Sequence, residues 1–279
     1  MAHSGEERGS SKLHYRGSAY TRHYVPVVTS EPAGGRPLQR IGSPAPGAVV
    51  TLTGVRLRQD RTPVPDGISM HIPASQSVAL YDRADGCAVE LLDVIAGRRR
   101  PRGGEVTVHG TRHRMGVRAL DRSQKDRWLY SGRFPLLPSR SVSGNMLSVL
   151  RSRRTDAARA RVAELLVITG AANLASRRLD TLSAEQLWRI LIARALLIDP
   201  QLLLAEDPAP GLDSRTASLA LDLLMDAQAR FGFTLIVATG RLATAARCER
   251  VVSLVDGQVT GDDLIGEDAW TRGRIDRIG

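Results

Sequence analysis

Apolar and polar positions alternate in short runs after residue 46, which predicts a series of β-strands. Gly47–Leu57 alternates in the manner of an edge strand, and Ile68–Ile72 reads as a second strand. Ser77–Tyr81 is a continuous apolar run of the kind found in buried strands. A helix is expected at Ala88–Ile95, and the glycines within Pro101–Gly110 predict a short antiparallel hairpin strand.

The pattern takes on the period of a helix after residue 142 and returns to buried strands near residue 202. Ser143–Ala172 has apolar positions near helical spacing, and Ser183 is the residue type of an N-cap for a helix that runs to Ile198. The later expected elements are a buried strand at Leu202–Ala205, a helix at about Thr216–Arg230, a buried strand at Thr234–Ala238, and a hairpin strand at Val251–Val255 before the Asp256-Gly257 turn.

This order of elements indicates an α/β fold, because buried parallel strands need helices to connect them. Residues 1–46 are rich in Gly, Ser, Pro, Arg and His without apolar periodicity, so we expect a disordered basic tail there. The folded domain is expected over residues 47–260, with a helical subdomain at about 133–190 and a C-terminal tail at 261–279.

The formal net charge of +10 comes almost wholly from arginine, since the lysines are Lys12 and Lys125. Basic clusters attract phosphates, which makes anionic lipid or nucleic acid a candidate partner of the tail; a solvated basic surface is the other interpretation. Cys87 and Cys248 lie far apart without a C-x-x-C partner, so reduced thiols are expected rather than a disulfide or a zinc site.

No apolar run suits a membrane-spanning helix, which needs about 20 residues. The best run, Ile190–Ala205, is interrupted by Arg194 and Asp199. The first residues include Glu6 and Glu7 and lack the apolar core of a secretory signal. A cytoplasmic or peripheral protein is therefore expected.

Two neighbouring blocks resemble a known family. Leu182–Gln186 and the helix that follows resemble the signature motif of ATP-binding cassette (ABC) proteins, and Asp199–Pro208 with Gly211–Asp213 resembles their Walker B strand and D-loop. The resemblance covers about Gly47–Val259. It implies a cassette related to the P-loop NTPases, with an antiparallel β subdomain and an inserted helical subdomain.

The same resemblance sets the register of a phosphate-binding Walker A loop, because Val78–Leu80 and Leu91–Gly97 match its flanks. Such a loop needs glycines for close backbone approach, a lysine for the phosphates and a hydroxyl for magnesium. Those positions are taken in this chain, in order, by Asp82, Cys87, Ala88 and Val89. The candidate cofactor-binding residues of this altered loop are Arg83, Gly86, Cys87, Ala88, Val89 and Glu90.

The charges of this loop oppose phosphate binding. Asp82, Asp85 and Glu90 bring negative charge to a place where a polyanion would bind, so we expect them to repel ATP. Arg83 is the one candidate for a substitute cation, and a solvated loop residue is its alternative interpretation.

The resemblance implies that Glu206 stands at the magnesium-binding aspartate and Asp207 at the general-base glutamate, so the two carboxylates are interchanged. Two acids at a strand end can hold magnesium, with Glu206 as the candidate ligand, or can cap the strand. The shorter Asp207 would lie farther from an attacking water, and such misplacement costs about a hundredfold in rate. Gly240 stands where the family has a histidine that contacts the γ-phosphate.

The signature motif and D-loop are less altered. Ser183, Gln186 and Asp213 keep the residue types of the family, and the resemblance implies that they face the nucleotide of a partner subunit. Helix capping and turn stabilisation are the other interpretation. Ala184 and Glu185 replace the two glycines of the motif.

The leading hypothesis is a degenerate ABC cassette, non-catalytic or weakly catalytic, that serves a membrane transporter at the inner face of the cell membrane. Its expected partners are ABC permease subunits and a second, intact cassette. Mg-ATP is the cofactor if there is one, with the loop residues counting against binding by this chain alone, and no small-molecule substrate is expected. A cytoplasmic regulatory or scaffold protein that reuses the fold is the second hypothesis. A working ATPase with an atypical phosphate loop is the third.

Overall fold

The structure, a computed structural model, describes residues 12–15, 18–21, 48–57, 67–83, 86–112, 137–150, 155–207 and 212–265. The chain divides into two compact units, Met1–Leu38 and Gln39–Gly279. In the first unit, β1 (Lys12–Tyr15) pairs antiparallel with β2 (Ser18–Thr21). The expectation of a disordered tail over residues 1–46 did not include this ribbon.

The second unit contains a four-stranded antiparallel sheet in the order β4-β3-β6-β7. Its strands are β3 (Ala48–Arg56), β4 (Ile68–Pro73), β6 (Gly103–Val108) and β7 (Thr111–Arg112). The prediction of an edge strand at 47–57 is wrong, because β3 has a hydrogen-bonded neighbour on each side. Its alternation arises because one face of the sheet is buried while the other meets solvent.

The larger sheet has five strands in the order β11-β10-β5-β9-β8. The strands β5 (Ser77–Tyr81), β8 (Leu202–Glu206), β9 (Thr234–Thr239) and β10 (Arg250–Val255) run parallel to one another, and β11 (Gln258–Leu264) pairs antiparallel with β10. The predicted turn between β10 and β11 is confirmed by the positive φ angles of Asp256 (48°) and Gly257 (75°). The last strand continues past the expected domain boundary at residue 260.

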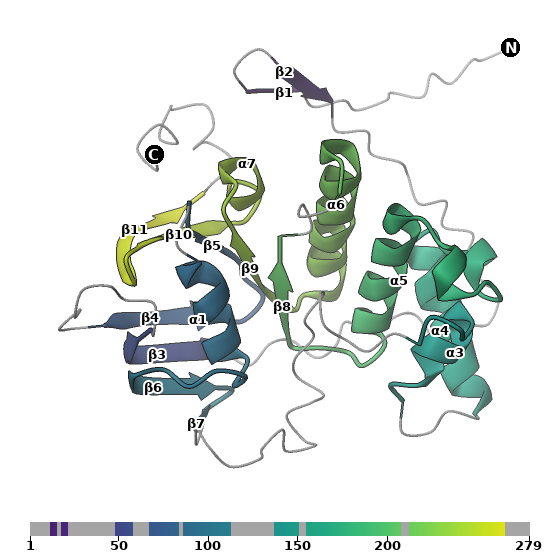
Figure 1. The fold of residues 1–279 in the computed structure, drawn as a ribbon, viewed down its shortest axis with the longest axis horizontal. Coiled ribbons are helices and arrows are strands. Elements are labelled where there is room, and N and C mark those ends of the chain that lie inside the picture. The colour runs from purple at the N-terminus through teal and green to yellow at the C-terminus, as the bar shows by residue number, and fades with distance from the viewer. Residues whose placement is uncertain are drawn as a thin grey trace, which may run out of the picture. The chain divides into compact units, whose positions relative to one another are not determined.

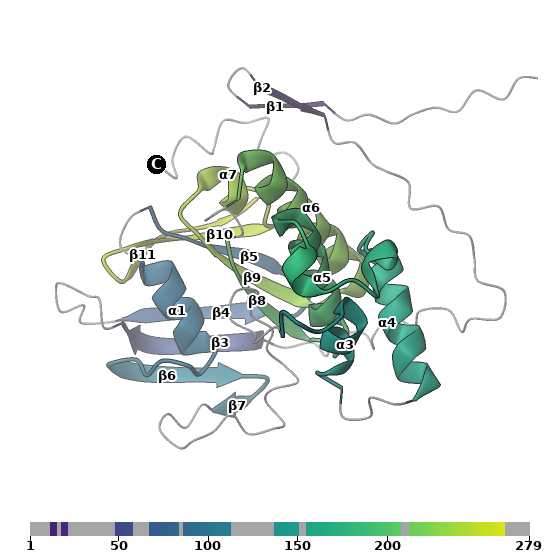
Figure 2. The same ribbon diagram turned by 45° about the vertical axis from the view of Figure 1, so that its right-hand side comes forward.

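Both faces of the larger sheet are covered (Figures 1 and 2). Val78 and Leu80 pack into a core with α1 (Cys87–Ile95) and the antiparallel sheet. Ala79 and Tyr81 pack into a second core on the opposite face. That face carries the helices α5 (Ala184–Leu196), α6 (Ser214–Phe231) and α7 (Leu242–Ala245). This arrangement confirms the predicted α/β fold and explains why the parallel strands are mostly apolar.

A helical subdomain packs against α5. It contains α3 (Val142–Leu147), α4 (Asp156–Ile168) and two short 3-10 helices at Ala172–Leu174 and Leu179–Thr181. The fully buried Asn145 joins α3 to the segment before it, since its side chain accepts a hydrogen bond from the Leu137 N–H and donates one to the Leu137 carbonyl oxygen. The insertion predicted from helical spacing is therefore present.

Cys87 and Cys248 are both buried, and no disulfide joins them. Burial raises the pKa of the Cys248 thiol to about 12, because the thiolate would lose its hydration. Among the residues that the structure describes, no helix has the length and apolar character needed to cross a membrane.

The contact of β6 with β3 generates a test of the fold. Gly104 has a φ of 85°, and a Cβ placed there would lie 2.2 Å from the Gly54 carbonyl oxygen. Gly104→Ala should lower the free energy of unfolding by more than the roughly 1–3 kcal/mol typical of a side chain at positive φ, because it adds a backbone clash. Gly110→Ala is the matched control, since Gly110 has a φ of 71° and open space around it. Urea denaturation measures both; equal losses would contradict the clash.

Candidate functional site

Three parallel strands end side by side, and the residues that follow them form the candidate site. Tyr81 at the end of β5 pairs with Thr239 at the end of β9, and Glu206 at the end of β8 pairs with Ala238. In open α/β sheets, ligands bind beyond the carboxyl ends of the strands. The site is therefore built from the loops that start at Asp82, Asp207 and Gly240.

The loop after β5 is anchored by Asp82, whose side chain is buried. Its backbone N–H donates to the Thr239 carbonyl oxygen at 3.1 Å. Its carboxylate Oδ2 accepts a hydrogen bond of 3.2 Å from the Ala88 N–H, in the first turn of α1. Gly86 is the N-cap of α1 with a φ of 75° and has no side chain to cap the helix. Asp82, the residue after β5, therefore caps α1 in place of Gly86.

The other candidate residues of this loop divide between surface and core. Arg83, Gly86 and Val89 are exposed, whereas Cys87 and Ala88 are buried. Asp85 lies outside the described residues.

Glu90 lies differently from the expected charge beside a bound phosphate. Its side chain is 1% exposed and forms an ion pair with the Arg99 guanidinium at 3.4 Å. A buried carboxylate needs a partner of opposite charge, and the segment after α1 supplies it. Glu90 therefore contributes a neutralised pair within the fold rather than a free charge to the loop.

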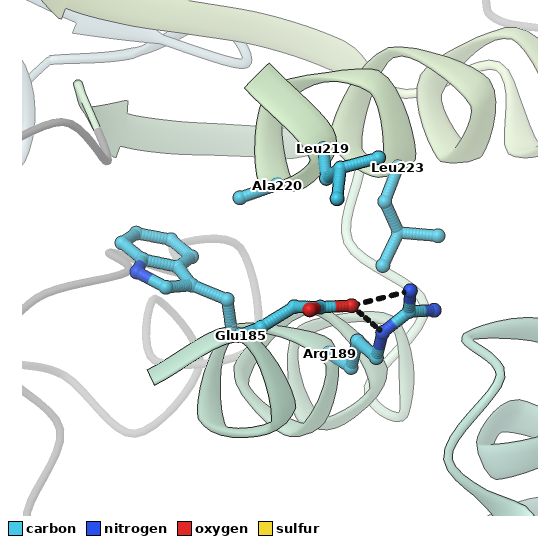
Figure 3. A pocket seen from close by; sticks show the side chains of 6 residues that line it. Glu185, Arg189, Leu219, Ala220 and Leu223 are labelled. Carbon is cyan, nitrogen blue, oxygen red and sulfur yellow. Dashed lines mark hydrogen bonds and ion pairs between the residues drawn. The ribbon is translucent and has the colours of Figure 1, made fainter. Parts of the chain in front are cut away.

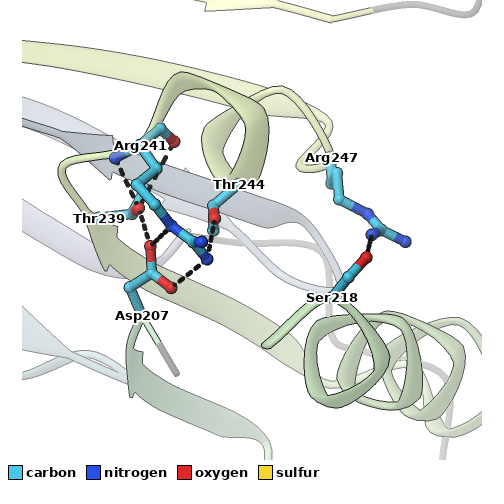
Figure 4. Close-up of polar contacts among 6 residues, drawn as sticks. All are labelled: Asp207, Ser218, Thr239, Arg241, Thr244 and Arg247. Atoms are coloured by element: carbon cyan, nitrogen blue, oxygen red, sulfur yellow. Dashed lines mark hydrogen bonds and ion pairs between the residues drawn. The ribbon is translucent and has the colours of Figure 1, made fainter. Parts of the chain in front are cut away.

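Asp207 is held by Arg241 from the loop after β9 (Figure 4). Arg241 donates from Nη2 to Oδ1 at 2.8 Å and from Nε to Oδ2 at 3.0 Å, which is the two-point geometry that guanidinium and carboxylate favour. The Thr239 hydroxyl also donates to Oδ2, at 2.5 Å, and accepts from the Arg241 N–H at 3.0 Å. Both carboxylate oxygens of Asp207 are therefore engaged within the chain.

Glu206 lies one residue earlier and is half-buried. Burial raises the pKa of its carboxyl, while the positive charge of Arg98 lowers it and the negative charge of Asp93 raises it. Arg98 and Asp93 are themselves an ion pair at 2.5 Å. No group of three or more His, Cys, Asp or Glu side chains suited to a metal ion gathers among the described residues.

Ser183 and Gln186 form a capping box at the start of α5. The Ser183 hydroxyl oxygen accepts from the Gln186 N–H at 3.2 Å, and the Gln186 side-chain oxygen accepts from the Ser183 N–H at 3.1 Å. The capping role predicted for Ser183 is confirmed. Its role toward a partner's nucleotide stays a prediction.

Asp213 has the same kind of position at the start of α6. Its Oδ1 accepts from the backbone N–H groups of Arg215 and Thr216, and its Oδ2 accepts from the Thr216 hydroxyl at 2.6 Å. Two hydrogen bonds from Thr216 lower the pKa of the Asp213 carboxyl, because they favour its charged form. The bond from the Thr216 hydroxyl has the larger effect, and the bond from its backbone N–H comes second.

A small pocket lies between α5 and α6 (Figure 3). Glu185, which the family resemblance places at a signature glycine, lines it and forms an ion pair with Arg189 at 2.8 Å. The other lining side chains are Trp188, Leu219, Ala220 and Leu223. The charge of Glu185 is thus balanced one helical turn away on the same helix.

The sequence did not indicate that three arginines belong to the site: Arg98, Arg99 and Arg241. Each lies near a carboxylate at a position where the family resemblance implies a nucleotide or metal contact. The available signal was the coincidence of unusual acids in the motifs with arginines just after α1 and β9. Sequence spacing alone does not say which arginine reaches which acid.

Comparison with known proteins identifies the family of this chain. A family model described as "ABC transporter" matches residues 66–210, more than half of the chain. The lipoprotein-releasing system ATP-binding protein LolD of Anaeromyxobacter dehalogenans is 32% identical over 237 residues, which cover 80% of this chain and 97% of that protein. The aliphatic sulfonates import ATP-binding protein SsuB of Shigella flexneri is 31% identical over 217 residues, with 77% and 81% covered.

Among solved structures, cbiO1 from Clostridium perfringens, part of the ABC transporter complex cbiONQ, superposes with a TM-score of 0.69 at 22% identity, covering 82% of this chain and 93% of that one. This likeness supports the fold. The family match and the sequence relatives carry the assignment further. The family match at residues 66–210 includes both the loop before α1 and the strand β8. The chain belongs to the ATP-binding (nucleotide-binding domain) family of ABC transporters.

Proposed function

We propose that this chain is a non-catalytic or weakly catalytic cassette of a membrane transporter and that an intact second cassette supplies the working phosphate loop. The observation that carries the proposal is the ion pair of Asp207 with Arg241. A general base must present a free oxygen to the proton that it removes. Both oxygens of Asp207 accept hydrogen bonds from Arg241, and one accepts a further bond from Thr239.

The residues at the loop do not fit Mg-ATP, the cofactor that the family implies. Ala88 offers no ammonium group to the phosphates, and Val89 offers no hydroxyl to the metal. The Ala88 N–H, which would face a phosphate, already donates to Asp82. Arg83 is exposed and remains the one candidate cation of the described part of the loop. We therefore derive no catalytic step through ATP at this site.

The proposed pairing rests on the two caps that keep the family's residue types. Ser183 with Gln186 and Asp213 are ordered at the starts of α5 and α6, where they would face the nucleotide held by the second cassette. The capping bonds fix these residues without any nucleotide of their own. Permease subunits would place the assembly on the inner face of the cell membrane, and the chain itself would take no small-molecule substrate.

Calorimetric titration tests the proposal directly. The purified chain should show no heat of binding with Mg-ATP up to about 1 mM, a range in which working enzymes bind their substrates. The matched variant restores the loop with Asp82→Gly, Cys87→Gly, Ala88→Lys and Val89→Ser, and it should gain binding. Co-purification with candidate permeases and an intact cassette should recover a complex.

Two results would contradict this proposal. One is magnesium-dependent ATP turnover by the unaltered chain that Glu206→Ala and Asp207→Ala together abolish. The other is failure to form a complex with any candidate permease or intact cassette. Salt-sensitive binding to anionic vesicles or DNA that disappears with residues 1–46 would instead favour a regulatory or scaffold protein.

The ion pair itself makes a stability prediction. Arg241→Ala should lower the free energy of unfolding by about 1–2 kcal/mol, because it leaves the Asp207 carboxylate, only 9% exposed, without its charged partner; the exposure of Arg241 limits the loss. Adding Asp207→Asn should recover part of the loss in a double-mutant cycle. Arg140→Ala, at an exposed arginine of another loop, is the control. The prediction would be contradicted if Arg241→Ala left the free energy of unfolding unchanged and added magnesium stabilised the protein, because Asp207 would then act as a metal ligand.

A further inference from the structure

The feature with the strongest further consequence is the carboxylate of Asp82, a buried anion at the start of α1. We propose that Asp82 is a built-in substitute for a bound phosphate, whose carboxylate occupies the Ala88 N–H at the start of α1 without a nucleotide. This inference rests on the proposed function, since it explains how a cassette without its own nucleotide chemistry keeps its fold.

The need for an acceptor follows from the helix. The first backbone N–H groups of a helix have no partner within it, and a side chain at the N-cap normally supplies one. Gly86 at the N-cap of α1 has no side chain, so the acceptor must come from elsewhere. The structure shows it coming from the end of β5, where Asp82 Oδ2 accepts from the Ala88 N–H.

Charge strengthens this contact. The N-terminus of a helix carries partial positive charge, which is why it binds phosphates in other proteins. A carboxylate of the chain at this position is attracted by the same partial positive charge. An incoming anion would have to displace Asp82 and would meet its repulsion at short range in a poorly hydrated place. Asp82 therefore competes directly with any phosphate for the Ala88 N–H.

The surroundings hold Asp82 in this position. Its N–H donates to the Thr239 carbonyl oxygen, and the Thr239 hydroxyl donates to Asp207. A Cβ at Gly240 would lie 3.1 Å from the Asp82 carbonyl oxygen, so a side chain there would press on the loop. Asp82 and the Asp207–Arg241 pair thus belong to one network that joins the ends of β5, β8 and β9.

The test uses the full chain without metal, and its readouts are hydrogen exchange at the Ala88 amide and thermal unfolding with and without pyrophosphate. In the unaltered chain, the Ala88 amide should be protected and pyrophosphate should leave the melting temperature unchanged. Asp82→Ala should speed exchange at Ala88 by about tenfold or more, as expected for loss of a cap, and should lower the melting temperature. Millimolar pyrophosphate should then restore much of the protection at the Ala88 amide and much of the melting temperature.

Asp82→Asn separates the hydrogen bond from the charge. Its amide oxygen can still accept from Ala88, so protection should largely remain, while the loss of repulsion should let pyrophosphate raise the melting temperature. This variant also keeps the test decisive if Asp82→Ala does not fold. Asp226→Asn removes an exposed acid of α6 and controls for net charge, so it should match the unaltered chain.

Two outcomes would overturn the inference. One is unchanged exchange at Ala88 in Asp82→Ala, which would mean that the carboxylate is not the acceptor. The other is pyrophosphate stabilising the unaltered chain as strongly as Asp82→Asn, which would mean that Asp82 does not exclude anions. Neither readout involves ATP turnover or a partner cassette, so this inference can fail while the proposed function stands, and the reverse.

Discussion

The parallel pairing of β5 with β9 and of β9 with β8 brings three strand ends together, and the polar contacts that join the loops after these strands depend on it. Because Tyr81 pairs with Thr239, Asp82, the first residue after β5, reaches the Thr239 carbonyl oxygen. Because Glu206 pairs with Ala238, Asp207, the first residue after β8, reaches the Thr239 hydroxyl and Arg241. A shift of one residue in either register would separate these groups and turn the strand side chains to the opposite face.

Neutralisation within the chain is the common property of the site. Glu90 pairs with Arg99, Asp207 pairs with Arg241, and Asp82 lies against the amide end of α1. Leaving any of these acids charged and unpaired in a buried place would cost several times more than a typical hydrogen bond contributes. The described residues supply this balance themselves, which supports the proposal of a non-catalytic cassette.

The caps at the starts of α5 and α6 show why the signature residues do not by themselves report function. The hydrogen bonds that Ser183, Gln186 and Asp213 make are those expected for stable helix termini, whether or not a partner's nucleotide lies beyond them. Selection for the fold alone would keep such residues. The loop before α1 is different, because helix stability does not call for an acid at the end of β5 when an ordinary N-cap would serve.

The sequence by itself determined most of the strands and the family. Its apolar runs located the buried strands within about a residue, Ser183 marked the start of α5, and the order of its motifs identified the cassette. These features are local, and local spacing reports them well. Through the family resemblance, the sequence also predicted which motif residues are replaced. Only the tertiary structure decided which partners the charged side chains have. Glu90 pairs with Arg99, Asp207 pairs with Arg241, and Asp82 accepts a hydrogen bond from the Ala88 N–H. Only the tertiary structure showed that β3 is an interior strand. Each of these depends on which strands become neighbours and on which side chains then come within hydrogen-bond distance. That information lies in contacts between segments far apart in the chain, which no local pattern records.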